Sequence, residues 1–193
     1  MPRKSLVRER TAQILDAMER CVAAHGLGGT SLELVAQEAG VKRSILRHYV
    51  GNRDELVRAM ATRLTERYRG ELRALVRSLD GPDAVESLLS ALFAEPSAED
   101  FRNVVVVEAL IAASETDDGV RGPMAELVEA TVDAVRAVLR KEHPGTDART
   151  AWSVASGVVG LYFNHASLHP LRLAPRHAKA ALDSARRLVG TLA

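Results

Sequence analysis

Apolar positions recur at helical spacing along the whole chain, and short clusters of turn-forming residues interrupt them. The first such segment runs from about Ser5 to His25 and ends at a cluster of glycines that predicts a turn. A second, short helix should begin at Thr30, because Thr30 and Glu33 have the spacing of a capping box, and end at Gly40. The N-terminal pattern therefore predicts two helices joined by a turn.

A third short helix is predicted over residues 42–50, where Gly51 ends it. Its apolar and aromatic residues should face inward: Val41, Ile45, Leu46, Tyr49 and Val50. Its polar and basic residues should face outward: Lys42, Arg43, Ser44, Arg47 and His48. The pattern therefore predicts an amphipathic helix with a basic outer face.

Six further amphipathic segments complete the pattern, beginning with a long connecting helix from Arg53 to about Leu79. The other five are expected to end near Phe93, Ser114, Glu142, Leu168 and Leu192. The run 104–107 suits a strand by propensity, but no other segment offers it a partner, so we assign it to a helix. We therefore predict an all-α chain of about nine helices: a three-helix head (1–52), a connecting helix (53–80) and a C-terminal helical bundle (81–193).

Charge is distributed unevenly along the chain. Residues 1–70 carry 13 Lys and Arg and 8 Asp and Glu, a net +5, whereas residues 71–193 carry 13 and 17, a net −4. A basic head suggests a polyanionic partner, and chance scatter of surface charge is the alternative. No apolar run approaches the roughly 20 residues that span a bilayer, so we expect a soluble, cytoplasmic chain without a membrane partner.

Motifs of catalytic and metal sites are missing from the sequence. It contains no phosphate-binding glycine loop, no Gly-x-Ser-x-Gly elbow and no His-Glu-x-x-His, which argues against an enzyme. His165 and His169 have the i, i+4 spacing of a metal pair, yet no third ligand is recognisable nearby. The single cysteine, Cys21, is interpreted as a buried structural thiol, with a redox sensor as the alternative. We predict no cofactor and no metal.

The two short helices and their turn are typical of a helix-turn-helix, whose second helix enters the DNA major groove. Arg43 and Arg47 lie four residues apart, so each can contact a guanine from the same face. The other candidate contacts to bases or phosphates are Thr30, Ser31, Lys42, Ser44, His48, Tyr49 and Arg53. The alternative is that the basic side chains only solvate an exposed face.

Residues 8–68 resemble the head of the TetR family of bacterial regulators. The resemblance lies in Ile14-Leu15-Asp16-Ala17, Gly26, Thr30-Ser31, residues 35–41 and residues 46–56. It implies a head that binds double-stranded operator DNA, and a C-terminal domain that dimerises and binds a small-molecule effector. The implied function is a ligand-responsive regulator, a repressor on a near-palindromic operator. An activator, or a ligand-binding protein that has lost DNA binding, is the alternative.

The sequence departs from the family's pattern at three positions of the third helix. Ser44 replaces a frequent glycine, Ile45 a frequent threonine and Arg47 a frequent tyrosine. The operator sequence therefore cannot be borrowed from a relative. Our hypothesis is that Arg47 selects a G·C pair.

The effector pocket and the dimer surface are predicted from side-chain type in the C-terminal part. Candidate lining residues are Phe93, Phe101, Val105, Ala109, Met124, Val128 and Trp152, with Glu108 as a polar anchor. Each can equally be plain core. The last two helices carry small residues that allow close approach, so we expect a homodimer through them, with packing inside one chain as the alternative.

Overall fold

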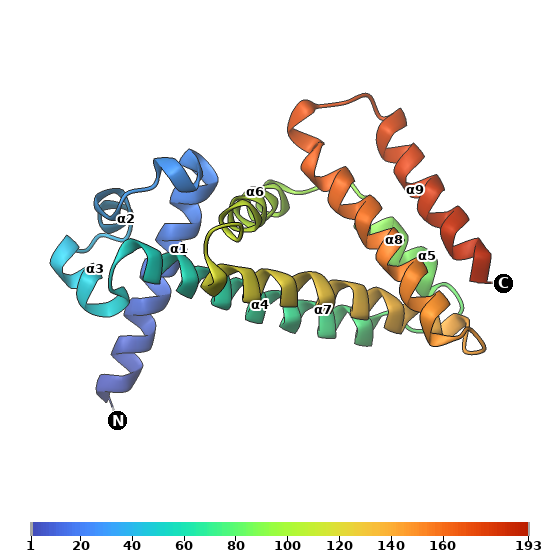
Figure 1. Cartoon of the computed structure of the whole chain (residues 1–193), viewed down its shortest axis with the longest axis horizontal. Helices are drawn as coiled ribbons and strands as arrows, with labels where there is room; N and C mark the ends of the chain where they lie inside the picture. Colours follow the sequence, from blue (N-terminus) through green and yellow to red (C-terminus); the bar gives the residue numbers. More distant parts are fainter. Residues whose placement is uncertain (1, 193) are drawn as a thin grey trace. The chain divides into compact units, whose positions relative to one another are not determined.

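The computed structural model describes residues 2–192, with side chains from residue 6, and they form helices joined by turns (Figure 1). Its nine α-helices are α1 Pro2–Gly29, α2 Leu32–Glu38, α3 Arg43–Val50, α4 Arg53–Ser78, α5 Ala84–Leu92, α6 Ala98–Ala113, α7 Asp118–Glu142, α8 Ala148–Ser167 and α9 Arg176–Val189. Two 3-10 turns follow the last two helices, η1 His169–Leu171 and η2 Gly190–Leu192. Residues 2–192 contain no strand, so the all-α prediction and the count of about nine helices are confirmed.

The chain divides into two compact units. The first contains the chain up to Glu66 together with Arg102–Ala125, and the second contains Arg67–Phe101 and the chain from Glu126 onward. Three helices, α4, α6 and α7, contribute residues to both units, so the division does not follow one break in the sequence. The predicted functional boundaries at residues 52 and 80 stay a prediction.

In the first unit, α1, α2 and α3 pack against one another (Figure 1). The inward face of α1 follows the helical repeat, with Ile14, Met18 and Val22 buried. Cys21 lies on the same helix and is 4% exposed, and this burial raises the pKa of its thiol. A raised pKa disfavours the reactive thiolate, which supports a structural thiol over a redox sensor.

Glycine and hydroxyl side chains set the turn between α1 and α2. Gly26 has φ +67°, a backbone conformation that other residues rarely adopt, and it interrupts the helix where the sequence predicted a stop. The prediction that Thr30 caps α2 was wrong. Ser31 is the N-cap and accepts from the Leu34 N–H, while the Thr30 hydroxyl donates back to the Gly26 carbonyl at 2.8 Å. The two hydroxyls are neighbours, and only the fold decides which one faces α2.

In the second unit, buried residues of α5, α7, α8 and α9 form one hydrophobic core. Helices α8 and α9 run side by side (Figure 1). Asp147 begins α8 by accepting from the N–H groups of Arg149 and Thr150, as its place before an apolar-periodic segment suggests. Crossing a bilayer takes a longer and more apolar helix than any formed by the described residues.

Candidate functional site

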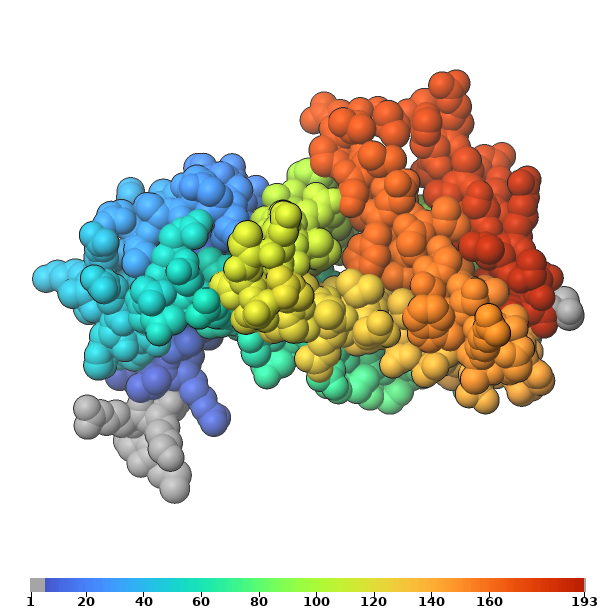
Figure 2. Space-filling model, viewed as in Figure 1, coloured from blue at the N-terminus to red at the C-terminus, as the bar shows by residue number. Residues whose placement is uncertain are grey.

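The candidate site is the outer face of α3, which lies at the surface of the first unit (Figure 2). Its exposed side chains are Lys42, Arg43, Ser44, Ile45, Arg47 and His48. On the opposite face Leu46 and Val50 are buried and anchor the helix. The predicted amphipathic helix with a basic outer face is therefore present.

Ile45 corrects the prediction for this helix, because its side chain is 40% exposed rather than turned inward. Successive helix residues turn by roughly 100°. The buried direction is set by Leu46 and Val50, which places Ile45 on one edge of the exposed face. Arg43 and Arg47 lie on the opposite edge. The outer face of α3 thus has a basic edge and an apolar edge.

The two arginines of this face differ in their surroundings. Arg43 forms an ion pair with Glu33 of α2, and both side chains are more than half exposed. Such exposed pairs contribute little free energy, so Arg43 can exchange Glu33 for another anion at small cost. Within the described residues, Arg47 forms no ion pair. Both guanidinium groups are therefore available to a polyanion.

Four of the other predicted contacts lie in different settings. Ser31 is exposed, whereas Thr30 is 2% exposed and holds the end of α1, so only Ser31 presents its hydroxyl at the surface. Tyr49 is half-buried, and its ring meets the His48 ring edge-on at 5.3 Å. Lys42 occupies the N-cap position of α3.

Arg53 is occupied inside the first unit instead of projecting freely. Its Nη2 donates to the carbonyl of Leu27 at 2.5 Å and its Nε donates to the carbonyl of Thr30 at 3.3 Å. These bonds join the start of α4 to the turn before α2. We predicted a phosphate contact for Arg53. These two bonds instead give it the role of a positioning residue within the first unit.

Other residues that position the head were missed by the sequence analysis. Gln13 of α1 donates to the carbonyl of Ala39, at the end of α2, at 2.7 Å. Asn52 and Glu55 form a reciprocal capping box at the start of α4. The Asn-x-x-Glu spacing was a usable signal for the second, whereas nothing near Gln13 in the sequence points to Ala39.

The residues predicted to line an effector pocket are placed as follows. Val105, Glu108 and Ala109 are half-buried on α6, as is Phe101 on the same helix. Val128 is also half-buried, and Phe93 and Met124 are buried. Trp152 is 43% exposed on α8, so it is part of the surface and not of an interior wall. Inward position was inferred from its apolar type alone, and an aromatic residue can equally cover a surface patch.

His165 and His169 lie at the end of α8 and in η1. His165 contacts the ring of Phe93, with centroids 5.7 Å apart, and His169 contacts the ring of Phe101 at 5.5 Å. Among the residues with described side chains, no three potential ligands are close enough to hold a metal ion. Both histidines instead line a hollow in the second unit.

The small residues of α8 serve packing inside the chain at three of four positions. Ala151 and Ala155 are fully buried. A Cβ placed on Gly157 would lie 3.1 Å from Leu188 Cδ1 of α9, so the glycine lets the two helices approach. Gly160 is exposed, and a Cβ there would meet no atom within 4 Å. Packing within one chain therefore explains Ala151, Ala155 and Gly157.

Residues 14–60 match the family model described as bacterial regulatory proteins, tetR family. A relative from Burkholderia thailandensis, named as the HTH-type transcriptional regulator BetI, is 35% identical over 85 residues. The match covers 44% of this chain and 44% of that relative, so less than half of its length is shared.

Two solved structures resemble the fold over nearly the whole chain. A TetR transcription regulator from Haloarcula marismortui has a TM-score of 0.79 at 18% identity, covering 95% of this chain and 98% of its own. The multidrug binding protein EbrR, complexed with imidazole, has a TM-score of 0.67 at 23% identity, covering 93% and 94%. The head thus matches the tetR family model over residues 14–60, and the chain as a whole has the fold of these solved regulators and binding proteins.

Proposed function

We propose that the chain is a ligand-responsive DNA-binding transcription regulator that acts in the cytoplasm as a repressor on a near-palindromic operator. The proposal rests on the outer face of α3. Its basic side chains are exposed, while Leu46 and Val50 on the opposite face are buried and anchor the helix. A major groove about 12 Å wide admits one such helix. The relatives that match the head are named as transcriptional regulators, which supports the same function.

The proposed contacts to DNA come from the basic edge of this face and from exposed side chains near it. Arg43 and Arg47 are one helical turn apart, and each guanidinium can donate two hydrogen bonds to the O6 and N7 of a guanine. Lys42, Ser31 and His48 are exposed and suit phosphate contacts that set register without selecting sequence. Specificity therefore rests mainly on α3.

Dimerisation is proposed through α8 and α9. Trp152 and Gly160 are both exposed on α8, and a second copy of the chain would cover them. In a symmetric dimer the two α3 helices would meet half-sites about 34 Å apart. The two-fold symmetry of such a dimer predicts a near-palindromic operator.

Response to a small molecule requires differential binding. An effector changes DNA affinity only if it binds the DNA-incompetent form of the protein more tightly. EbrR, which shares the fold, is named as a multidrug binding protein and was solved in complex with imidazole, and this supports a ligand site in a chain of this fold. The half-buried face of α6 with Val105, Glu108 and Ala109 stays a candidate for effector contacts.

The test is selection of bound duplexes from a random DNA pool by the full chain, at low and at high salt. A palindrome enriched by the native chain and not by Arg47→Ala would support the proposal. Binding without sequence preference that disappears at high salt would reflect phosphate contacts alone. That result, or no binding, would contradict operator recognition and favour a ligand-binding protein without a DNA partner.

A further inference from the structure

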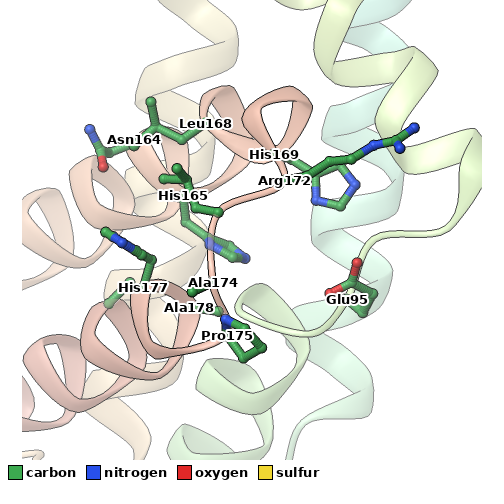
Figure 3. A pocket seen from close by; sticks show the side chains of 12 residues that line it. Glu95, Asn164, His165, Leu168, His169, Arg172, Ala174, Pro175, His177 and Ala178 are labelled. Atoms are coloured by element: carbon green, nitrogen blue, oxygen red, sulfur yellow. The ribbon is translucent and has the colours of Figure 1, made fainter.

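The second unit contains a hollow of about 480 Å³ between the end of α8, the turn after it and the start of α9. Its polar lining consists of Glu95, Asn164, His165, His169, Arg172 and His177. In Figure 3, His165 extends into the space between α8 and α9, while His169 and Arg172 lie near each other with Glu95 across from them. The volume is that of a small-molecule site, and none of the eight residues predicted to line an effector pocket borders it.

Basic groups dominate this lining. Three imidazoles, one guanidinium and a single carboxylate, that of Glu95, line the hollow. Arg172 forms no ion pair within residues 6–192. Leu168, Ala178 and Ala181 supply apolar surface beside these groups. The hollow thus offers hydrogen-bond donors to an anionic group of a ligand and an apolar surface to the rest of that ligand.

Aromatic contacts restrict two of the donor side chains, His165 and His169. The His165 ring rests against the buried ring of Phe93, and the His169 ring rests against the half-buried ring of Phe101. These contacts restrict both imidazoles before any ligand arrives. Groups that are already positioned bind a ligand with a smaller loss of conformational entropy.

Arg172 adds an independent observation. Its φ is +48° and its ψ +46°, and it is the one non-glycine residue with positive φ among those described. Side chains rarely adopt this left-handed conformation because it costs free energy, and such residues concentrate at functional sites. Its N–H closes the 3-10 turn by donating to the carbonyl of His169. An arginine in a left-handed conformation, rather than a glycine, therefore lies at the edge of the hollow.

We propose that this hollow binds a small organic acid. The carboxylate would accept hydrogen bonds from the Arg172 guanidinium and from the imidazoles of His165 and His169, and the body of the acid would lie against Leu168 and Ala178. A single carboxylate fits better than a phosphate dianion, because Glu95 in the lining repels a second negative charge. That this acid is the effector rests on the proposed function, whereas the binding site does not.

The experiment compares acids with alcohols of the same shape. Hexanoate and benzoate, with hexanol and benzyl alcohol as matched neutral probes, are titrated into the full chain without DNA, by calorimetry and by melting temperature. We expect the acids to bind and to raise the melting temperature, and the alcohols to do neither. Equal effects of acids and alcohols, or no effect of either acid, would overturn the proposal.

Two variants test the role of Arg172. Arg172→Gly removes the guanidinium but suits the left-handed backbone, so the variant should fold and lose at least about tenfold in acid affinity, as expected for a lost charge-assisted hydrogen bond. Arg176→Ala removes a neighbouring exposed cation that does not line the hollow, and it should bind as the native chain does. Equal affinity of Arg172→Gly and the native chain would overturn the proposal.

Glu95→Gln separates an anion site from a metal site. Removal of the one negative charge in the lining should strengthen acid binding, whereas a metal ion would lose a ligand. Stabilisation by Zn²⁺ or Ni²⁺ that Glu95→Gln abolishes, without acid binding, would replace the proposal by a metal site.

The effector role is measured separately, on DNA found by duplex selection. Release of the native chain by the acids, with no release of Arg172→Gly, would support that role. Acid binding to the free protein with no change in DNA affinity would overturn the effector role and leave the acid site standing. Failure to select any DNA would contradict the proposed function while the binding data still decide the hollow.

Discussion

The guanidinium of Arg53 donates to the carbonyl of Leu27 across 2.5 Å, at the turn that leads from α1 into α2. A second donor of the same group bonds the carbonyl of Thr30. Since α4 begins at Arg53, the connecting helix and the turn are held by one side chain. The head is therefore tied to α4 through backbone carbonyls that any sequence at the turn would supply.

Arg53→Lys should lower the free energy of unfolding by about 1 kcal/mol, because an ammonium group cannot reproduce the planar fork that serves both carbonyls. Urea unfolding followed by circular dichroism measures this. Arg47→Lys, an exposed site one helix earlier, is the matched control and should leave stability unchanged. Unchanged stability of Arg53→Lys together with weaker DNA binding would instead make Arg53 a phosphate contact.

Arg47→Ala should weaken DNA binding by about 1–3 kcal/mol on an operator with the contacted G·C pair and much less where that pair is replaced. Fluorescence anisotropy on duplexes with single substituted base pairs measures the difference. Lys42→Ala should weaken binding to every duplex alike and reduce the salt dependence, as a phosphate contact does. If Arg47→Ala gives the same loss on every duplex, Arg47 does not select sequence.

Ile45 gives a prediction about thymine. Its exposed side chain suits contact with the C5 methyl group of a thymine, the one apolar group at the floor of the major groove. Replacing the contacted thymine by deoxyuridine removes only this methyl group and should weaken native binding by roughly fourfold, the value of one buried carbon. Ile45→Ala should bind both duplexes equally. Native binding that is insensitive to every such replacement would contradict the contact.

The ion pair between Glu86 of α5 and Arg186 of α9 predicts a pH effect on stability. Its hydrogen bond holds the pKa of Glu86 below the ordinary value of 4.5. The unfolded chain therefore takes up this proton first as the pH falls, so the stabilisation is complete above pH 4.5 and disappears as the pH drops through the lowered pKa.

Glu86→Gln should accordingly destabilise the chain at neutral pH, by less than about 1 kcal/mol because the pair is exposed to solvent. The difference from the native chain should shrink below pH 4.5. Thermal unfolding over a pH series measures it, with Glu129→Gln on α7 as an exposed control. A difference that stays constant with pH would show that the pair does not contribute through its charge.

Gly157 and Gly160 form a matched pair on α8. Alanine in place of an exposed helical glycine stabilises by about 1 kcal/mol, and Gly160→Ala should gain that amount in the single chain, where no second copy covers the residue. Gly157→Ala should gain less or lose stability, because its Cβ would lie 3.1 Å from Leu188 Cδ1. Thermal unfolding of both variants compares them. Equal gains in stability would mean that the Leu188 side chain of α9 moves away from the added Cβ at little cost in free energy.

The sequence by itself determined the helices and most of their ends. Apolar spacing defined α4 and α8, and Gly26 and Gly51 marked ends that the structure confirms. It also indicated the basic outer face of α3. These features are local. Helix propensity, capping and the helical repeat depend on residues a few positions apart, so the sequence alone is enough to predict them.

Only the tertiary structure decided which side chains remain free. Ile45 is exposed because Leu46 and Val50 occupy the packed side of α3, and Arg53 is engaged because the turn after α1 comes within its reach. The hollow joins Glu95 to Arg172, residues that are distant in sequence. Such outcomes depend on which residues pack opposite each side chain. Those partners set the free energy of burial and hydrogen bonding, and the local sequence does not identify them.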